Sequence, residues 1–146
     1  MAYQSVERIF GALEAGHAAR DADLILSCYA PGALIYDLAP PLQRRGLNKE
    51  ETQAWLATWD GPVTVNNVEA SLSEDGDFAW STALNRMRGR KRDGEEVDLW
   101  FRSTMCFRKG AAGWAIVHEH TSVPFYMDGS ARAATDLQPP PARREE

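Results

Sequence analysis

The second half of the chain contains four segments with the composition of β-strands, joined by short turns. They cover residues 63–72, 78–88, 96–108 and 113–124. Turn residues separate these segments, and the Asp93-Gly94 pair is a strong hairpin signal. Connections this short join antiparallel neighbours, because parallel strands need a long crossover. The sequence therefore predicts a four-stranded antiparallel meander, which restricts the fold more than any other feature.

The first half of the chain is helical in pattern. Apolar side chains recur at helical spacing in three segments, which are residues 6–17, 24–29 and 52–59. Asp21 and Asn48 are suited to be the N-caps of the second and third helices, and Pro31-Gly32 is expected to end the second. Residues 33–38 are typical of a short strand. Three helices followed by a meander predict an α+β fold, with the helices packed on one face of the sheet.

The other face of the predicted sheet also needs a cover. The triplet Leu99-Trp100-Phe101 is apolar on both faces of its strand. Helices would bury only one of these faces, and a strand that is apolar on both sides indicates burial on both. A second copy of the chain is the simplest cover. We therefore expect a homodimer that forms through the outer face of the sheet.

Length, charge and cysteine content restrict the class of protein. A chain of 146 residues forms one domain of ordinary size, and its net charge of −5 argues against a nucleic-acid surface. The N-terminus lacks the pattern of a signal peptide, and no apolar run reaches the roughly 20 residues of a membrane helix. Cys28 and Cys106 lie far apart and have no metal-ligand spacing. We expect a cytoplasmic protein that binds neither nucleic acid nor membranes, with a flexible tail at residues 127–146.

The last predicted strand changes character along its length. If it is regular, one face carries five side chains, which are Trp114, Ile116, His118, His120 and Ser122. This face begins apolar and ends with two titratable imidazoles and a hydroxyl. Such a strand is suited to begin in a hydrophobic core and to end in a polar cavity, and we expect both histidines to face that cavity.

Asp37 is the candidate acid/base residue. It follows the apolar stretch Ala33-Leu34-Ile35-Tyr36, at the end of the short strand. A carboxylate in an apolar pocket has a raised pKa and can take a proton from a carbon acid and return it. The simpler interpretation is a solvated carboxylate, or a partner for Arg44 or Arg45.

His118 and His120 are candidates for two kinds of site. As catalytic groups they would hydrogen-bond to an oxyanion or relay a proton to Asp37. As structural groups they would be satisfied by Ser122, by Tyr36 or by backbone carbonyls. A metal site would need about three protein ligands, and only His17 and Asp37 are available as additions. We therefore expect no metal and no cofactor.

Large side chains are candidates for the wall of the pocket, where they would bind a flat apolar ligand. The predicted substrate-binding residues are Tyr36, Trp55, Trp80, Met105, Trp114 and Ser122. The tryptophans are interpreted as core and pocket wall, and not as a cofactor site. Tyr36 alternates away from Asp37 in a regular strand and would need a bulge to reach the same pocket.

Three helices, an aspartate-bearing strand, a Pro-rich loop ending at Gly46 and a final Trp-x-Ile-x-His-x-His-x-Ser-x-Pro strand together resemble the NTF2-like superfamily. Within it, the chain is most similar to SnoaL-like and ketosteroid-isomerase-like proteins. The resemblance implies a cone-shaped curved antiparallel sheet wrapped around three N-terminal helices, over residues 1–126. It also implies an internal pocket and a dimer.

The resemblance places Asp37 at the position of the isomerase's general base. The isomerase's oxyanion tyrosine falls at Leu13, and its neutral aspartate falls near Ser103 or Met105. The resemblance thus implies an isomerase, cyclase or dehydratase that acts without a cofactor on a small apolar carbonyl compound. The last strand also resembles the association domain of calcium/calmodulin-dependent kinase, and the alternative is therefore a non-catalytic ligand-binding or oligomerisation module.

Overall fold

The computed structural model describes residues 3–141. Its helices are α1 (Val6–Ala19), α2 (Ala22–Leu26) and α3 (Lys49–Leu56). Its strands are β1 (Tyr29–Tyr36), β2 (Arg44–Arg45), β3 (Thr64–Asp75), β4 (Phe78–Arg90), β5 (Glu96–Gly110) and β6 (Gly113–Ser122). Within residues 3–141 no helix is both long and apolar enough to cross a bilayer.

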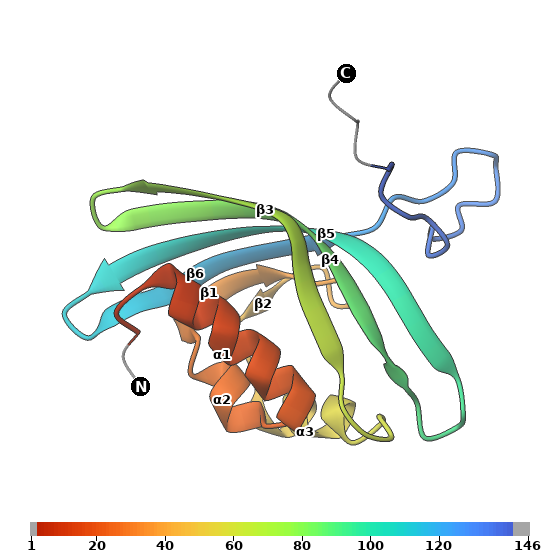
Figure 1. Ribbon diagram of the computed structural model, residues 1–146, viewed down its shortest axis with the longest axis horizontal. Helices are drawn as coiled ribbons and strands as arrows, with labels where there is room; N and C mark the ends of the chain where they lie inside the picture. The colour runs from red at the N-terminus through yellow and green to blue at the C-terminus, as the bar shows by residue number, and fades with distance from the viewer. Residues whose placement is uncertain (1–2, 142–146) are drawn as a thin grey trace.

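The strands form one six-stranded sheet in the order β2-β1-β6-β5-β4-β3. Neighbours are antiparallel except β1 and β6, which run parallel; β2, α3 and the strands β3, β4 and β5 separate them in the chain. The sheet is curved, and the three helices lie against its concave side (Figure 1). We call this side the inner face and the opposite side the outer face. The predicted α+β cone is confirmed.

Local side-chain hydrogen bonds begin the helices. The Asp21 side chain accepts a hydrogen bond from the Leu24 amide, and the Asn48 side chain accepts one from the Glu51 amide. Both predicted N-caps are thus confirmed. The predicted end of the second helix is wrong, since α2 stops at Leu26 and Tyr29 already belongs to β1. The Cys28 carbonyl accepts a hydrogen bond from the Ile116 amide, so pairing with β6 takes over where the helix stops.

The hydrophobic core fills one end of the inner face. Its buried members are Tyr3, Val6, Ile9, Cys28, Ala79, Met105, Phe107, Trp114 and Ile116. Phe10 of α1 meets Phe107 of β5 edge to face, with ring centroids 5.7 Å apart. The first helix is therefore held against the beginning of β6 and the end of β5, and the far end of the inner face is left for the cavity described below.

A β-bulge divides β6 into two parts. Cys106 pairs with His118, but the next residue of β5, Phe107, pairs with Ile116. Val117 is therefore an extra residue without a partner in β5. Because side chains alternate between faces, one extra residue reverses the alternation beyond it. Ile116 consequently lies on the inner face, and His118 lies on the outer face.

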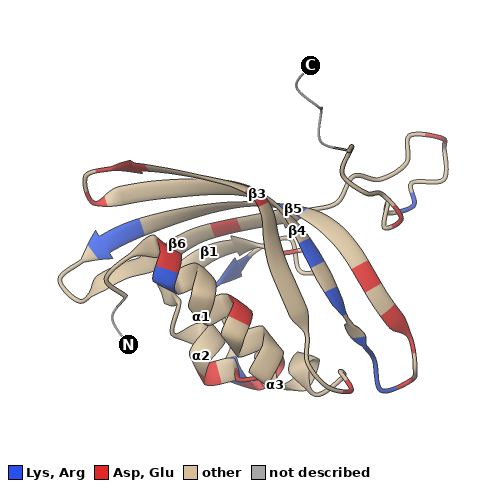
Figure 2. Ribbon diagram, viewed as in Figure 1, with Lys and Arg blue, Asp and Glu red and all other residues tan. Residues whose placement is uncertain are grey.

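Charged residues concentrate on the long β4–β5 hairpin, where basic positions of β4 lie beside acidic positions of β5 (Figure 2). Arg86 makes a bidentate ion pair with Asp98, at 2.8 and 2.7 Å. Arg90 approaches Glu96 at 3.8 Å. The basic run of this hairpin is thus balanced by acids of the facing strand.

After β6 the chain leaves the sheet on the side away from the helices (Figure 1). Phe125 and Ala133 form an isolated bridge, and the Tyr126 hydroxyl donates a hydrogen bond to Asp136. The flexible tail predicted at residues 127–146 is described only to residue 141, and its mobility stays a prediction.

Candidate functional site

A cavity of about 750 Å³ lies between the inner face of the sheet and the helices. Its wall is largely apolar. The apolar side chains that line it include Phe10, Leu13, Ile25, Ile35, Leu47 and Phe101. This volume and this lining are suited to a small organic molecule with an apolar body.

Glu119 of β6 is a half-buried carboxyl group that lines the cavity. It lines the cavity beside Met105, its partner in β5, and the Tyr29 hydroxyl donates a hydrogen bond to its Oε2. Burial raises the pKa of Glu119 to about 7, and the negative charge of Asp37 adds to the rise, whereas the hydrogen bond from Tyr29 opposes it. Burial also raises the pKa of Tyr29 well above its usual value, so this phenol keeps its proton.

Asp37 lies at the end of β1 and also lines the cavity. Its Oδ1 accepts a hydrogen bond from the Leu38 amide at 2.7 Å. The side chain is exposed to water, in contrast to Glu119. The site therefore holds two carboxyl groups in different environments, one exposed to water and one half-buried.

The cavity wall also carries a row of buried polar side chains on three neighbouring strands. Asn85 of β4 is 2% exposed, and Ser103 of β5 and Thr121 of β6 are each 7% exposed. Asn85 Nδ2 donates to Ser103 Oγ at 2.9 Å. Thr121 is the direct partner of Ser103 across the sheet. We call these three residues the polar row.

The basic groups of the cavity are neutral or paired. Arg44 Nη1 lies 2.5 Å from Glu51 Oε2, and its Nη2 donates to the Pro40 carbonyl. Burial lowers the pKa of His17, whose Nδ1 is 2.7 Å from the Leu13 carbonyl. His17 is therefore neutral at pH 7. Glu14, Asp37 and the ionised fraction of Glu119 then make the cavity negative.

The two predicted catalytic histidines lie outside this cavity. The prediction that they share a face with Trp114 and Ile116 is wrong, because the bulge at Val117 turns them to the outer face. His118 Nδ1 lies 2.7 Å from the Leu34 carbonyl. Both imidazoles pack edge to face against Tyr36, with ring centroids 5.1 and 5.2 Å away.

Of the six predicted wall residues, two line the cavity and four do not. Trp55 and Met105 line the cavity. Trp80, which is 42% exposed, lies on the outer face, as do Tyr36 and Ser122, the last of which accepts a hydrogen bond from Arg102. Trp114 faces inward but is buried in the core near Tyr3. Alternation along the strands accounts for the three outer residues, and the core occupies the end of the sheet where Trp114 lies.

Residues 6–126 match the SnoaL-like domain family. The chain belongs to this family. Its fold is shared with an NTF2-like protein of unknown function from Pseudomonas putida KT2440, with a TM-score of 0.80 and 25% identity, over 92% of this chain and 94% of that chain. The predicted membership of the NTF2-like, SnoaL-like group is therefore confirmed.

Two more distant structures share the fold with this SnoaL-like domain. A proposed ketosteroid isomerase from Shewanella frigidimarina NCIMB 400 has a TM-score of 0.61 and 21% identity, over 79% of this chain and 92% of that chain. A proposed calcium/calmodulin-dependent protein kinase II association domain from Xanthomonas campestris has a TM-score of 0.66 and 18% identity, over 80% of this chain and 84% of that chain. No curated protein matches the sequence.

Sequence reasoning missed Glu119, Tyr29 and Asn85 as site residues of this SnoaL-like domain. In a regular strand Glu119 shares a face with Val117 and Thr121, and that face would be the outer face of the sheet. Tyr29 was counted in a helix. The usable signal was Glu119 itself, because a carboxyl group between two β-branched residues of an interior strand is unusual when that face is buried.

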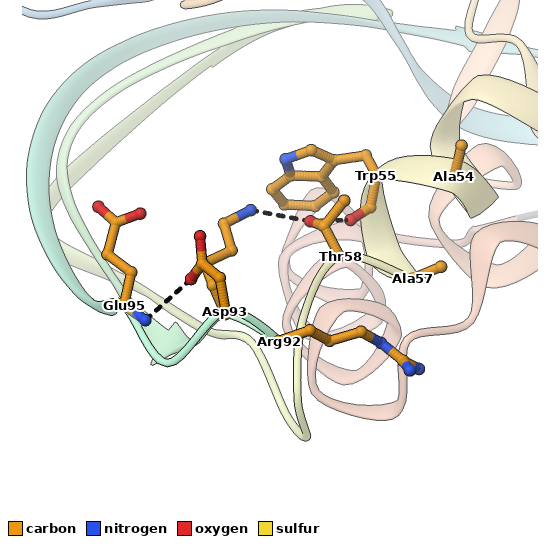
Figure 3. Close-up of a pocket in the computed structure, with 8 residues that line it drawn as sticks. Ala54, Trp55, Ala57, Thr58, Arg92, Asp93 and Glu95 are labelled. Carbon is orange, nitrogen blue, oxygen red and sulfur yellow. Dashed lines mark hydrogen bonds between the residues drawn. The ribbon is translucent and has the colours of Figure 1, made fainter.

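A second, open depression lies where the end of α3 meets the β4–β5 hairpin (Figure 3). Lys91 Nζ donates to Thr58 Oγ1 at 2.9 Å and sits 3.9 Å from the centroid of the Trp59 ring. These contacts tie the hairpin to the helix through a cation–π interaction and a hydrogen bond. The arrangement is structural. Within residues 3–141 no three His, Cys, Asp or Glu side chains are placed to hold a metal ion.

Proposed function

We propose that this SnoaL-like domain is a cofactor-independent enzyme that moves a proton next to the carbonyl group of a small, largely apolar compound. The observation that supports it best is the pair of carboxyl groups in one largely apolar cavity, Asp37 exposed to water and Glu119 half-buried. Two carboxyl groups whose environments separate their pKa values are suited to be the base and the acid of one reaction.

In this mechanism Asp37 is the base. Its carboxylate takes a proton from the carbon next to the carbonyl. Glu119, which is mostly neutral at a pH below its pKa of about 7, gives its proton to the carbonyl oxygen. The product of this step is a neutral enol. Where the compound carries a β,γ double bond, this enol is a dienol; Asp37 then returns its proton to the γ carbon, the double bond moves into conjugation with the carbonyl, and Glu119 takes back the hydroxyl proton. The net change is an isomerisation that consumes no other reactant, and each proton transfer is typically worth about 10² to 10⁴-fold in rate.

Tyr29 supports this assignment of roles. Its hydroxyl donates to Glu119 and therefore holds the carboxyl group in one orientation. In the isomerases that the sequence resembles, both oxyanion donors fall at positions that carry other residues here, at Leu13 and near Ser103 or Met105. Glu119 and Tyr29 offer the missing acid from β6 and β1 instead, and Asp37 keeps the position of the base.

Exchange of α-protons tests the proposal without the natural substrate. Small cyclic ketones such as 1-tetralone are incubated with the protein in D₂O, and loss of the α-proton signal is followed by NMR. We expect exchange above the buffer rate, and about 10² to 10⁴-fold slower exchange in Asp37→Asn. Asp75→Asn, at an exposed turn of the sheet, is the matched control. Unchanged exchange in Asp37→Asn would contradict the mechanism.

We also propose that the domain forms a homodimer through the outer face. Trp80 is 42% exposed there, beside the partly buried Tyr36, His118 and Cys106. An apolar and aromatic sheet face of this kind is suited to a second copy of the chain. The same face supports the alternative function, a non-catalytic assembly module, which a ring of many subunits in solution would favour over a dimer.

A further inference from the structure

We infer that the cavity binds a neutral molecule with two oxygen functions, and that Asn85 and Ser103 bind the oxygen that does not react. The inference rests on the proposed function, because it takes Glu119 and Asp37 as the reactive end of the cavity. It adds the chemical class of the ligand and names the residues that select it.

The polar row is buried in a wall that is otherwise largely apolar. Asn85 and Ser103 are at least nine-tenths buried, and both line the cavity. A buried polar group without a partner costs roughly 1–3 kcal/mol. The hydrogen bond between Asn85 and Ser103 offsets part of this cost, and a polar group of the molecule that fills the cavity would offset more.

The hydrogen bonds within the row leave capacity for a ligand. Asn85 uses Nδ2 for both of its contacts, to Ser103 Oγ at 2.9 Å and to the Phe101 carbonyl at 3.4 Å. Within residues 3–141 its Oδ1 accepts no hydrogen bond. Ser103 is an acceptor in its contact, so its own hydroxyl hydrogen is free. The row thus offers one acceptor and one donor, which together are complementary to a hydroxyl group.

The position of the row sets the size of the ligand. Met105 is the partner of Glu119, and Ser103 lies two residues along β5 on the same face. Glu119 and Ser103 are therefore diagonal neighbours across the sheet, roughly 7–8 Å apart. A carbonyl at Glu119 and a hydroxyl at the polar row then belong on opposite sides of a framework of about two fused rings.

The net charge of the cavity disfavours anionic ligands. Arg44 is paired with Glu51, and the pKa of His17 is lowered by burial. Glu14 and Asp37 have no free cation opposite them among the lining residues. A second function that carries a negative charge would be repelled, whereas a hydroxyl would not. The second oxygen of the ligand is therefore neutral.

Three probes with one framework test this inference by calorimetry. They are 6-hydroxy-1-tetralone, 1-tetralone, and the tetralone with a carboxylate in place of the hydroxyl. We expect the hydroxyl probe to bind the wild-type protein roughly tenfold more tightly than 1-tetralone, and the carboxylate to bind more weakly than either. Equal affinities for the first two probes, or binding of neither at millimolar concentration, would overturn the inference.

Variants assign the effect to the polar row. Asn85→Leu keeps the size of the side chain and should abolish the preference for the hydroxyl probe, and Ser103→Ala should reduce it. Thr82→Val, on the outer face of the same strand, is the matched control and should keep the preference. If Asn85→Leu does not fold, as judged by circular dichroism, Ser103→Ala decides, and an unchanged preference there overturns the inference.

The measured binding preference tests this inference, and proton exchange tests the proposed function, so the two can fail separately. Asp37→Asn should keep the preference for the hydroxyl probe, because Asp37 is not part of the polar row. Loss of proton exchange together with a retained preference supports both proposals. A preference without any exchange in the wild-type protein supports the ligand class and contradicts the enzyme. Proton exchange in the wild-type protein without a preference for the hydroxyl probe supports the enzyme and contradicts the ligand class.

Discussion

Tyr29 at the start of β1 donates a hydrogen bond to Glu119 in β6, 90 residues further along the chain. The contact exists because β6 returns to pair with β1 as a parallel neighbour, with Ile116 opposite Tyr29 and Glu119 three residues further along β6. It places a phenol that keeps its proton beside a carboxyl group whose pKa is about 7. The electrostatic behaviour of the cavity depends on this pair, and the first two predictions concern it.

The stability of the protein should depend on the ionisation of Glu119. Its pKa rises from 4.5 to about 7 in the folded state, so the folded protein holds an extra proton between these values. The contribution of this proton is complete below pH 4.5 and is lost as the pH rises through 7, and it amounts to about 3 kcal/mol. Glu119→Gln stays neutral. Relative to wild type, it should therefore gain about 3 kcal/mol between pH 4.5 and pH 8, measured by urea unfolding. Glu74→Gln, at an exposed turn, should show no such gain.

Removal of the Tyr29 hydroxyl should raise the pKa of Glu119 further. The hydrogen bond from Tyr29 favours the ionised carboxylate, so Tyr29→Phe removes an interaction that lowers the pKa. We expect a carboxyl titration above pH 7 by ¹³C NMR of labelled glutamate. Any proton exchange that needs neutral Glu119 should persist to correspondingly higher pH. Tyr126→Phe removes a similar contact to Asp136 and should leave Glu119 unchanged. A pKa for Glu119 that stays or falls in Tyr29→Phe would contradict this account.

The first residue of β6 should tolerate only glycine. Gly113 has a φ of +118°, and a Cβ there would lie 2.5 Å from the Tyr3 carbonyl oxygen. The neighbouring Trp114 amide donates to that same oxygen, so a shift would also break this bond. We expect Gly113→Ala to lower the free energy of unfolding by about 2–4 kcal/mol. Gly110→Ala is the matched control, because nothing lies within 4 Å of its Cβ position. Equal thermal stability of the two variants would contradict the clash.

A charge on the outer face should separate the proposed dimer. We expect the wild-type protein to have twice the chain mass by light scattering, and Trp80→Glu to have the mass of one chain, because like charges would face each other across a two-fold interface. Leu42→Glu, in an exposed loop before β2, should leave the mass unchanged. A monomeric wild-type protein would contradict the proposed interface, and a ring of many subunits would support the assembly function.

The sequence by itself determined most elements of this fold, since the signals for them are local, but it did not predict β2 or the start of β1. The caps at Asp21 and Asn48 lie within three residues of the amides that they satisfy. The Asp93-Gly94 turn joins β4 and β5, which pair as antiparallel neighbours on either side of it. Asp37 follows a short apolar strand that is visible in the chain, but the family resemblance, and not this local pattern, assigned it to the pocket, and it does line the cavity.

Only the tertiary structure decided which side chains of β6 face the cavity. The extra residue at Val117 leaves no mark in the sequence, because a bulge is defined by the partner strand, through Cys106 opposite His118 and Phe107 opposite Ile116. Side chains of a strand alternate between its two faces, so the one extra residue turned His118 and His120 to the outer face and placed Glu119 and Thr121 on the inner face. The identity of the acid in the site thus follows from strand pairing across the sheet, which no local pattern in the chain encodes.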